Sequence, residues 1–146
     1  MIGPPPPPGT VFQFSYLWAG EFDRGHFEGQ KDRPALAIAL ALTDENGVMT
    51  VMALAITHTP PLDAGDAIEL PRDVKWRLGL DEERSWIVTR EANAFRWPGP
   101  DIRFIPRREP PTPIYGRIPG DLLQRVAQQY LLHRRNRTAR LVHRDE

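Results

Sequence analysis

Two apolar segments joined by a turn constrain this 146-residue chain more than any other feature. The segments are Pro34–Thr43 and Val48–Thr57, and Asp44-Glu45-Asn46-Gly47 lies between them. Asn-Gly is the strongest short signal for a β-hairpin, so the two segments are predicted to be antiparallel neighbours. Along the first strand bulky side chains alternate with small ones, namely Leu36, Ile38, Leu40 and Leu42 against Ala35, Ala37, Ala39 and Ala41. The alanine face favours a tightly curved wall or a close neighbour.

The remaining segments predict a mainly β chain with one late helix. Besides the hairpin, strands are predicted for Thr10–Trp18, Ala67–Leu70, Arg84–Glu91 and Ile102–Ile105. Ala19–Lys31 is predicted to be a long polar loop, and Val74–Leu78 a helical turn closed by Gly79. Pro119–His133 predicts a C-terminal amphipathic helix, because its apolar residues follow 3-4 spacing. Short strands and one helix together predict a small barrel or a strongly coiled sheet.

A single domain is expected over residues 10–133. Residues 1–9 contain five consecutive prolines and are predicted to be a flexible leader, and the basic residues 134–146 a frayed tail. The sequence has no secretory signal, and its longest apolar run is far shorter than the roughly 20 residues of a membrane span. We therefore expect a cytoplasmic protein with no membrane contact. The absence of cysteine excludes disulfides, thiolate metal sites and cysteine nucleophiles.

Charge is unevenly distributed along the chain. Residues 1–73 carry 4 basic and 10 acidic side chains, whereas residues 74–146 carry 15 basic and 9 acidic ones. Of the 19 basic residues 17 are arginine, whose planar fork pairs with phosphate and stacks on bases. The arginine excess suits a nucleic-acid partner, although codon usage in a GC-rich genome produces the same excess.

The hairpin brings the start of one strand close to the end of the other. Arg33 is expected opposite the region of Thr57 to Pro60, at the sheet end far from the turn. A two- or four-residue loop places His58 on the face of Arg33, and a three-residue loop with a bulge places Thr57 and Thr59 there. The sequence leaves both arrangements open.

A rim of this kind has the groups needed to cleave RNA without a metal. Arg33 would clamp the phosphate, Thr57 would donate a hydrogen bond, and His26 or His58 would move protons. The plainer alternative is that Arg33 is a solvated loop residue and Thr57 only ends a strand. No phosphate-binding glycine loop is present, and the four histidines are too scattered to predict a metal site.

A second candidate surface is the aromatic and basic segment Asn93–Arg103. Its Phe95, Arg96 and Trp97 have the character of side chains that stack on unpaired bases, but the two aromatic rings equally suit a core position. The residues expected to contact substrate from this segment and from the rim are Lys31, Thr59, Glu91, Asn93, Arg96 and Trp97.

An ordered set of short motifs is similar to the PemK/MazF family of type II toxins, in particular its PemK-like growth-inhibitor branch. The motifs are Gly9–Phe14, Arg33–Leu36, Ile56-Thr57, Gly79–Ser85 and Trp97–Arg103, followed by the late helix. The resemblance implies a dimeric SH3-like barrel that cleaves single-stranded mRNA without metal or cofactor and is silenced by an antitoxin protein. It assigns Arg33 and Thr57 to the scissile phosphate and His26 to proton transfer.

The chain departs from that pattern at two places. The loop Ala19–Lys31 is longer than usual, and Val88–Glu91 lacks the aspartate that one branch of the family uses in catalysis. The same barrel also serves toxins of the CcdB type, which bind DNA gyrase and cut no RNA. A protein-binding toxin, or an inactive member that binds only an antitoxin, is therefore the alternative hypothesis.

Overall fold

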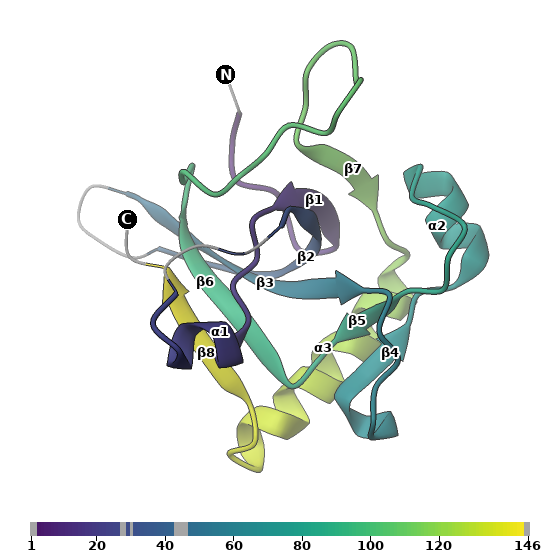
Figure 1. Ribbon diagram of the computed structural model, residues 1–146. Coiled ribbons are helices and arrows are strands. Elements are labelled where there is room, and N and C mark those ends of the chain that lie inside the picture. Colours follow the sequence, from purple (N-terminus) through teal and green to yellow (C-terminus); the bar gives the residue numbers. More distant parts are fainter. Residues whose placement is uncertain (1–2, 27–28, 30, 43–46, 145–146) are drawn as a thin grey trace.

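The computed structural model describes residues 3–26, 29, 31–42 and 47–144 (Figure 1). Its strands are β1 (Thr10–Phe14), β2 (Arg33–Leu42), β3 (Met49–Thr57), β4 (Ala67–Glu69), β5 (Trp86–Val88), β6 (Glu91–Trp97), β7 (Ile114–Arg117) and β8 (Arg140–Arg144). Its helices are α1 (Ala19–Asp23), α2 (Arg72–Leu78) and α3 (Gly120–Arg135), with a 3-10 turn η1 at Ala64–Asp66. No helix within these ranges has both the length and the apolar character needed to cross a membrane.

The strands of the described residues form one eight-stranded sheet in which β3 is the branch point. The main path runs β4-β5-β3-β2-β1-β7, while β6 pairs with β3 and β8. The β6–β8 pair is parallel and the other pairs are antiparallel. The strands and α3 confirm the predicted mainly β architecture and late helix. Within the described chain the strand pairings do not close the sheet into a barrel.

The β2–β3 hairpin contains a bulge within β2, whereas the sequence left open whether the hairpin is bulged and placed any bulge at the loop. Ala39 pairs with Met52, but Ala37 pairs with Ala53, so Ile38 is an extra residue on β2. An extra residue sends the side chains beyond it to the opposite face. Leu36 accordingly packs on the α3 side of the sheet and Leu40 on the other side, which corrects the unbroken alternation expected for this strand.

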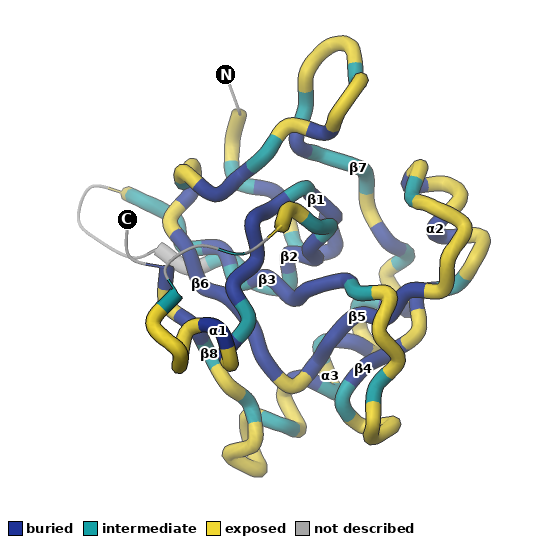
Figure 2. Tube along the Cα trace, viewed as in Figure 1, coloured by how far each residue is buried: buried dark blue, intermediate teal, exposed yellow. Residues whose placement is uncertain are grey.

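Two cores lie on opposite faces of β2 and β3, and Figure 2 shows that β3 and β6 are buried along most of their length. On one face Leu36, Leu54 and Ile56 pack with Leu122, Val126 and Tyr130 of α3. On the other face the small side chains of Ala35, Ala37, Ala53 and Ala55 leave room for the rings of Phe12, Phe14, Phe95 and Trp97. These rings are the close neighbours of the alanine face; those of Phe14 and Phe95 stack with centroids 4.4 Å apart.

Several predicted boundaries are wrong. The first strand ends at Phe14, four residues early, and the predicted polar loop contains α1. The strand predicted over Arg84–Glu91 divides into β5 and the start of β6, and β7 was not predicted. Ile102–Ile105 contributes only an isolated bridge between Ile102 and Phe14.

Described residues near both termini contact the body of the protein. In the proline-rich leader the Gly3 carbonyl accepts a hydrogen bond from Trp97 Nε1 at 2.9 Å, and Gly9 N donates to the Ala37 carbonyl at 2.7 Å. The predicted frayed tail instead contains β8, which pairs along β6 beside α1 (Figure 1). Its order has a physical cause, because Arg144 is buried against Asp101 at 2.9 Å.

Candidate functional site

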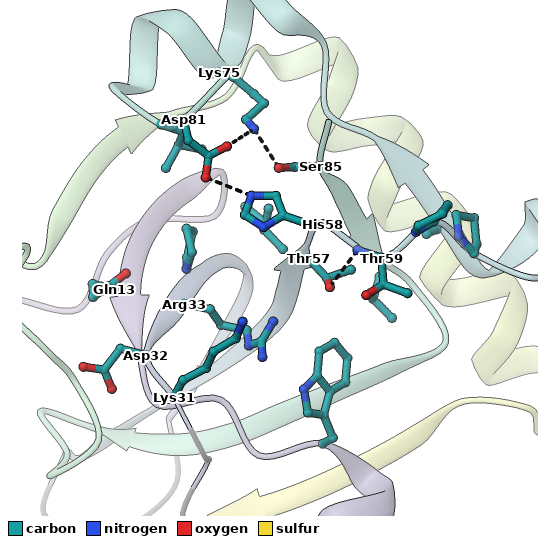
Figure 3. Close-up of a pocket in the computed structure, with 18 of the residues that line it drawn as sticks. Gln13, Lys31, Asp32, Arg33, Thr57, His58, Thr59, Lys75, Asp81 and Ser85 are labelled. Carbon is teal, nitrogen blue, oxygen red and sulfur yellow. Dashed lines mark hydrogen bonds and ion pairs between the residues drawn. The ribbon is translucent and has the colours of Figure 1, made fainter. Parts of the chain in front are cut away.

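A cavity of about 700 Å³ opens where the start of β2, the end of β3 and the segment between α2 and β5 meet (Figure 3). Arg33 and Lys31 extend into it from one side, Thr57 and Thr59 line another, and His58, Asp81 and Lys75 form its edge near α2 (Figure 3). Five of the predicted site residues therefore share one cavity: Lys31, Arg33, Thr57, His58 and Thr59.

The bulge at Ile38 decides which side chain faces Arg33. Beyond the bulge Leu36 pairs with Leu54 and Ala35 with Ala55, and the same register continued to the strand end sets Arg33 opposite Thr57. Without the extra residue, the register near the turn would set Arg33 opposite His58. The structure therefore has the arrangement in which the Thr57 hydroxyl lies on the side of Arg33.

Arg33 is held by an aromatic ring. Its guanidinium carbon lies 5.0 Å from the centroid of the Trp18 ring, within range of a cation–π interaction. Burial lowers the pKa of Arg33, and the Glu21 carboxylate opposes that shift, so Arg33 remains a cation at neutral pH. Its Nε is buried and has no hydrogen-bond partner among the described residues. A buried donor of this kind is suited to an anionic ligand that enters the cavity.

The Thr57 hydroxyl is oriented by the backbone that follows it. Its Oγ1 accepts a hydrogen bond from Thr59 N at 3.2 Å. A hydroxyl that accepts such a bond keeps its own proton for donation. Thr57 can therefore donate to the same anion that Arg33 attracts.

His58 belongs to a network of charged side chains at the α2 edge of the cavity. Its Nε2 lies 2.8 Å from Asp81 Oδ2, and its Nδ1 lies 3.3 Å from Glu83 Oε2. Asp81 Oδ1 accepts a hydrogen bond from Lys75 Nζ at 2.7 Å. The imidazole, a side chain able to exchange protons near neutral pH, lines the same cavity as Arg33 and Thr57.

The charges that line the cavity leave an excess of cations. Two of the three lining carboxylates pair with an arginine or a lysine, Asp32 with Arg103 and Asp81 with Lys75, and Asp66 Oδ1 lies 3.6 Å from His133 Nε2. Lys31, Arg33 and Arg90 also line the cavity, and no ion pair involves them in the part of the chain that the structure describes. The cavity is therefore electropositive and complementary to phosphate.

His58, Asp81 and Glu83 present donor atoms within 4.8 Å of one another, a spacing that also occurs around cations. The ammonium of Lys75 already lies 2.7 Å from Asp81, and its positive charge repels a cation there. We interpret the three side chains as a hydrogen-bonded network.

The other predicted site residues lie elsewhere. His26 is half-buried, follows α1 and does not line the cavity. Glu91 and Asn93 are buried: Glu91 accepts from Tyr16 Oη and Ala19 N, and Asn93 bonds the backbone of Leu17. Trp97 is buried with Phe95 in the aromatic core, the alternative that the sequence left open. Arg96 is exposed on β6, outside the cavity lining.

Sequence reasoning missed the residues that support the site. Trp18, Lys75, Asp81, Arg90 and Tyr115 all line the cavity, yet no local pattern marks them.

Comparison of the chain with protein-family models, with curated proteins and with solved structures found no match. The function must therefore be inferred from the site itself.

Proposed function

We propose that this protein is a cytoplasmic, metal-independent endoribonuclease of the PemK/MazF toxin type. The observation that carries the proposal is the convergence of Arg33 and Thr57 on one electropositive cavity, although they are distant in the sequence. From the resemblance we also propose that the sheet is related to the SH3-like barrel of that family, that the protein acts as a homodimer, and that a cognate antitoxin inhibits it.

In the proposed reaction the 2′-oxygen of a ribose attacks the adjacent phosphorus, and the bond from phosphorus to the 5′-oxygen breaks. Arg33 and Thr57 bind the non-bridging oxygens and stabilise the negative charge that grows on them. The protonated His58 ring donates its proton to the leaving 5′-oxygen. The 2′-hydroxyl proton passes to water, and solvent returns a proton to His58. The products are a cyclic 2′,3′-phosphate and a free 5′-hydroxyl.

A single-stranded substrate fits the remaining lining of the cavity. Trp18 and Tyr115 supply aromatic rings, and unpaired bases stack on such rings with little dependence on sequence. Lys31 and Arg90 add positive charge for the neighbouring phosphates.

Incubation of the purified protein with single-stranded RNA in the presence of EDTA tests the proposal. We expect cleavage, products that carry cyclic phosphate, and a loss of about 100-fold in rate for Arg33→Ala. Arg125→Ala, which removes an exposed arginine on α3, is the matched control and should cut at the wild-type rate. Intact RNA with the folded wild-type protein, or full activity of Arg33→Ala, would contradict the proposal and favour a protein-binding role.

A further inference from the structure

We propose that Lys75 is a positioning residue of this site: it fixes Asp81, and Asp81 fixes the His58 imidazole at the cavity edge. The inference rests on the proposed function for its catalytic consequence, but the chain of contacts itself stands on geometry. None of the three residues is adjacent to another in the sequence, and α2 supplies the first of them.

Lys75 is an unusual lysine because it is only 4% exposed. Its ammonium has three N–H donors, and three acceptors surround it: Asp81 Oδ1 at 2.7 Å, Ser85 Oγ at 2.7 Å and the Glu83 carbonyl. An ammonium is stable in the interior when an opposite charge and hydrogen bonds replace its water. With every donor engaged, Lys75 is a fixed cation and not a proton carrier.

Asp81 divides its two oxygens between Lys75 and His58. Oδ1 accepts from the ammonium, and Oδ2 lies 2.8 Å from His58 Nε2 (Figure 3). Partial burial raises the pKa of Asp81. The hydrogen bond and charge of Lys75, followed by those of His58, lower it by more than burial raises it, so the net shift is downward. The carboxylate is thus kept charged and oriented by a residue that is itself fixed.

His58 is left with one exchangeable nitrogen. A carboxylate only accepts, so the contact with Asp81 requires a proton on Nε2. Nδ1 faces Glu83 at 3.3 Å, and the side chain of Glu83 is 73% exposed, so this contact is readily replaced by a ligand. In the protonated ring Nδ1 carries the second proton, which is the one that the contact with Asp81 leaves available to a leaving oxygen.

Removal of Lys75 and removal of the Asp81 charge should affect His58 in opposite directions. Without the ammonium, the full charge of Asp81 acts on the ring and favours its protonated form; without the carboxylate, that form loses its partner. The other charged groups that line the cavity are the same in both variants, namely Lys31, Asp32, Arg33, Asp66 and Arg90. A lysine that only braced the segment between α2 and β5 would not produce opposite effects.

The test compares Lys75→Met, Asp81→Asn and the control Glu82→Gln, which alters an exposed neighbour outside the cavity. The ring protons of His58, assigned with His58→Gln, are followed by NMR across pH in the absence of RNA. We expect the pH at which the ring is half titrated to rise in Lys75→Met, to fall in Asp81→Asn and to stay at the wild-type value in the control. Shifts in the same direction, or no shift in folded variants, would overturn the proposal. If Lys75→Met does not fold, the pH of half titration of His58 is compared between Asp81→Asn and the control. The absence of a fall in Asp81→Asn then overturns the proposal.

The catalytic consequence is measured separately on an RNA oligomer. Each folded variant should lower the cleavage rate constant by about 10- to 100-fold, because the proton donor loses its alignment. Affinity for an uncleavable 2′-deoxy oligomer should stay at the wild-type level, since the anion-binding residues are untouched. Opposite NMR shifts in a protein that cuts no RNA would support the positioning of His58 and refute the nuclease. Cleavage that the variants leave unchanged would overturn the role of Lys75.

Discussion

Arg33 rests on the indole of Trp18, and no carboxylate pairs with it among the described residues: its guanidinium carbon lies 5.0 Å from the ring centroid. A carboxylate partner would fix the guanidinium equally well but would neutralise the charge that a phosphate needs. The ring holds the cation without competing for its N–H groups. Trp18 therefore explains how Arg33 stays both ordered and available.

Trp18→Leu should weaken the site without unfolding the protein. The cation–π contact is worth about 1 to 2 kcal/mol when it is partly desolvated, so kcat/KM on an RNA oligomer should fall by about tenfold. Trp76→Leu is the matched control, because Trp76 is 82% exposed on α2 and lies outside the cavity lining. Equal activity of the two variants would show that the ring does not position Arg33.

Two substitutions of Thr57 distinguish the effect of its hydroxyl from the effect of its side-chain shape. Thr57→Val should lower the cleavage rate by about 100-fold, because the developing charge on the phosphate loses a donor, and Thr57→Ser should recover most of the rate. Thr112→Val is the control: Thr112 Oγ1 accepts from Ile114 N at 3.1 Å, the same backbone contact that Thr57 makes, but Thr112 does not line the cavity. A Thr57→Val protein as fast as this control would exclude the hydroxyl from catalysis.

The hairpin and the late helix could be predicted because local patterns specify them. The β6 strand could not: it is paired on both edges and buried almost throughout, so the alternation that marks a half-buried strand is missing. The sequence assigned Glu91 and Asn93 to substrate contact, yet they are buried, and their partners, Tyr16 and Leu17, are more than seventy positions away. Pairing of β8 along β6 depends on the same distant contacts.

The candidate site could be predicted only in part, because its remaining features also depend on contacts that no local pattern specifies. Hairpin geometry brings position 33 near position 57 whatever the loop, but the face depends on the bulge at Ile38, which nothing in the alternating leucines and alanines marks. Lys75 looks like an ordinary lysine of a short amphipathic turn, and Asp81 like a solvated turn charge. Their contact appears only when α2 packs against the segment that follows it.

Glu91 predicts a pH dependence of stability. Burial raises its pKa, and hydrogen bonds from Ala19 N and Tyr16 Oη oppose the shift without cancelling it. A raised pKa means that the folded state binds the proton more tightly than the unfolded state. The contribution of Glu91 is therefore fully present below the unfolded-state pKa and is lost as pH rises through the folded-state pKa.

Glu91→Gln keeps an acceptor and cannot ionise, so its stability relative to the wild type should increase as pH rises. Urea unfolding at about pH 4, pH 5.5 and pH 7 measures the difference. Glu82→Gln, at an exposed position, should show no such trend. A difference that stays constant across this range would mean that Glu91 does not titrate differently in the two states.

Arg144 should anchor the C-terminal strand through a buried charge pair. Its side chain is 1% exposed, its NH2 lies 2.9 Å from Asp101 Oδ2, and its NH1 donates to Asn93 Oδ1 and to the Ser15 carbonyl. Arg144→Met leaves the Asp101 charge buried without compensation, and the free energy of unfolding should fall by about 3 to 5 kcal/mol. Adding Asp101→Asn removes that charge, so the double variant should be more stable than Arg144→Met alone. If the two effects simply add, Arg144 and Asp101 are not coupled, and β8 is held by the apolar packing of Val142 instead.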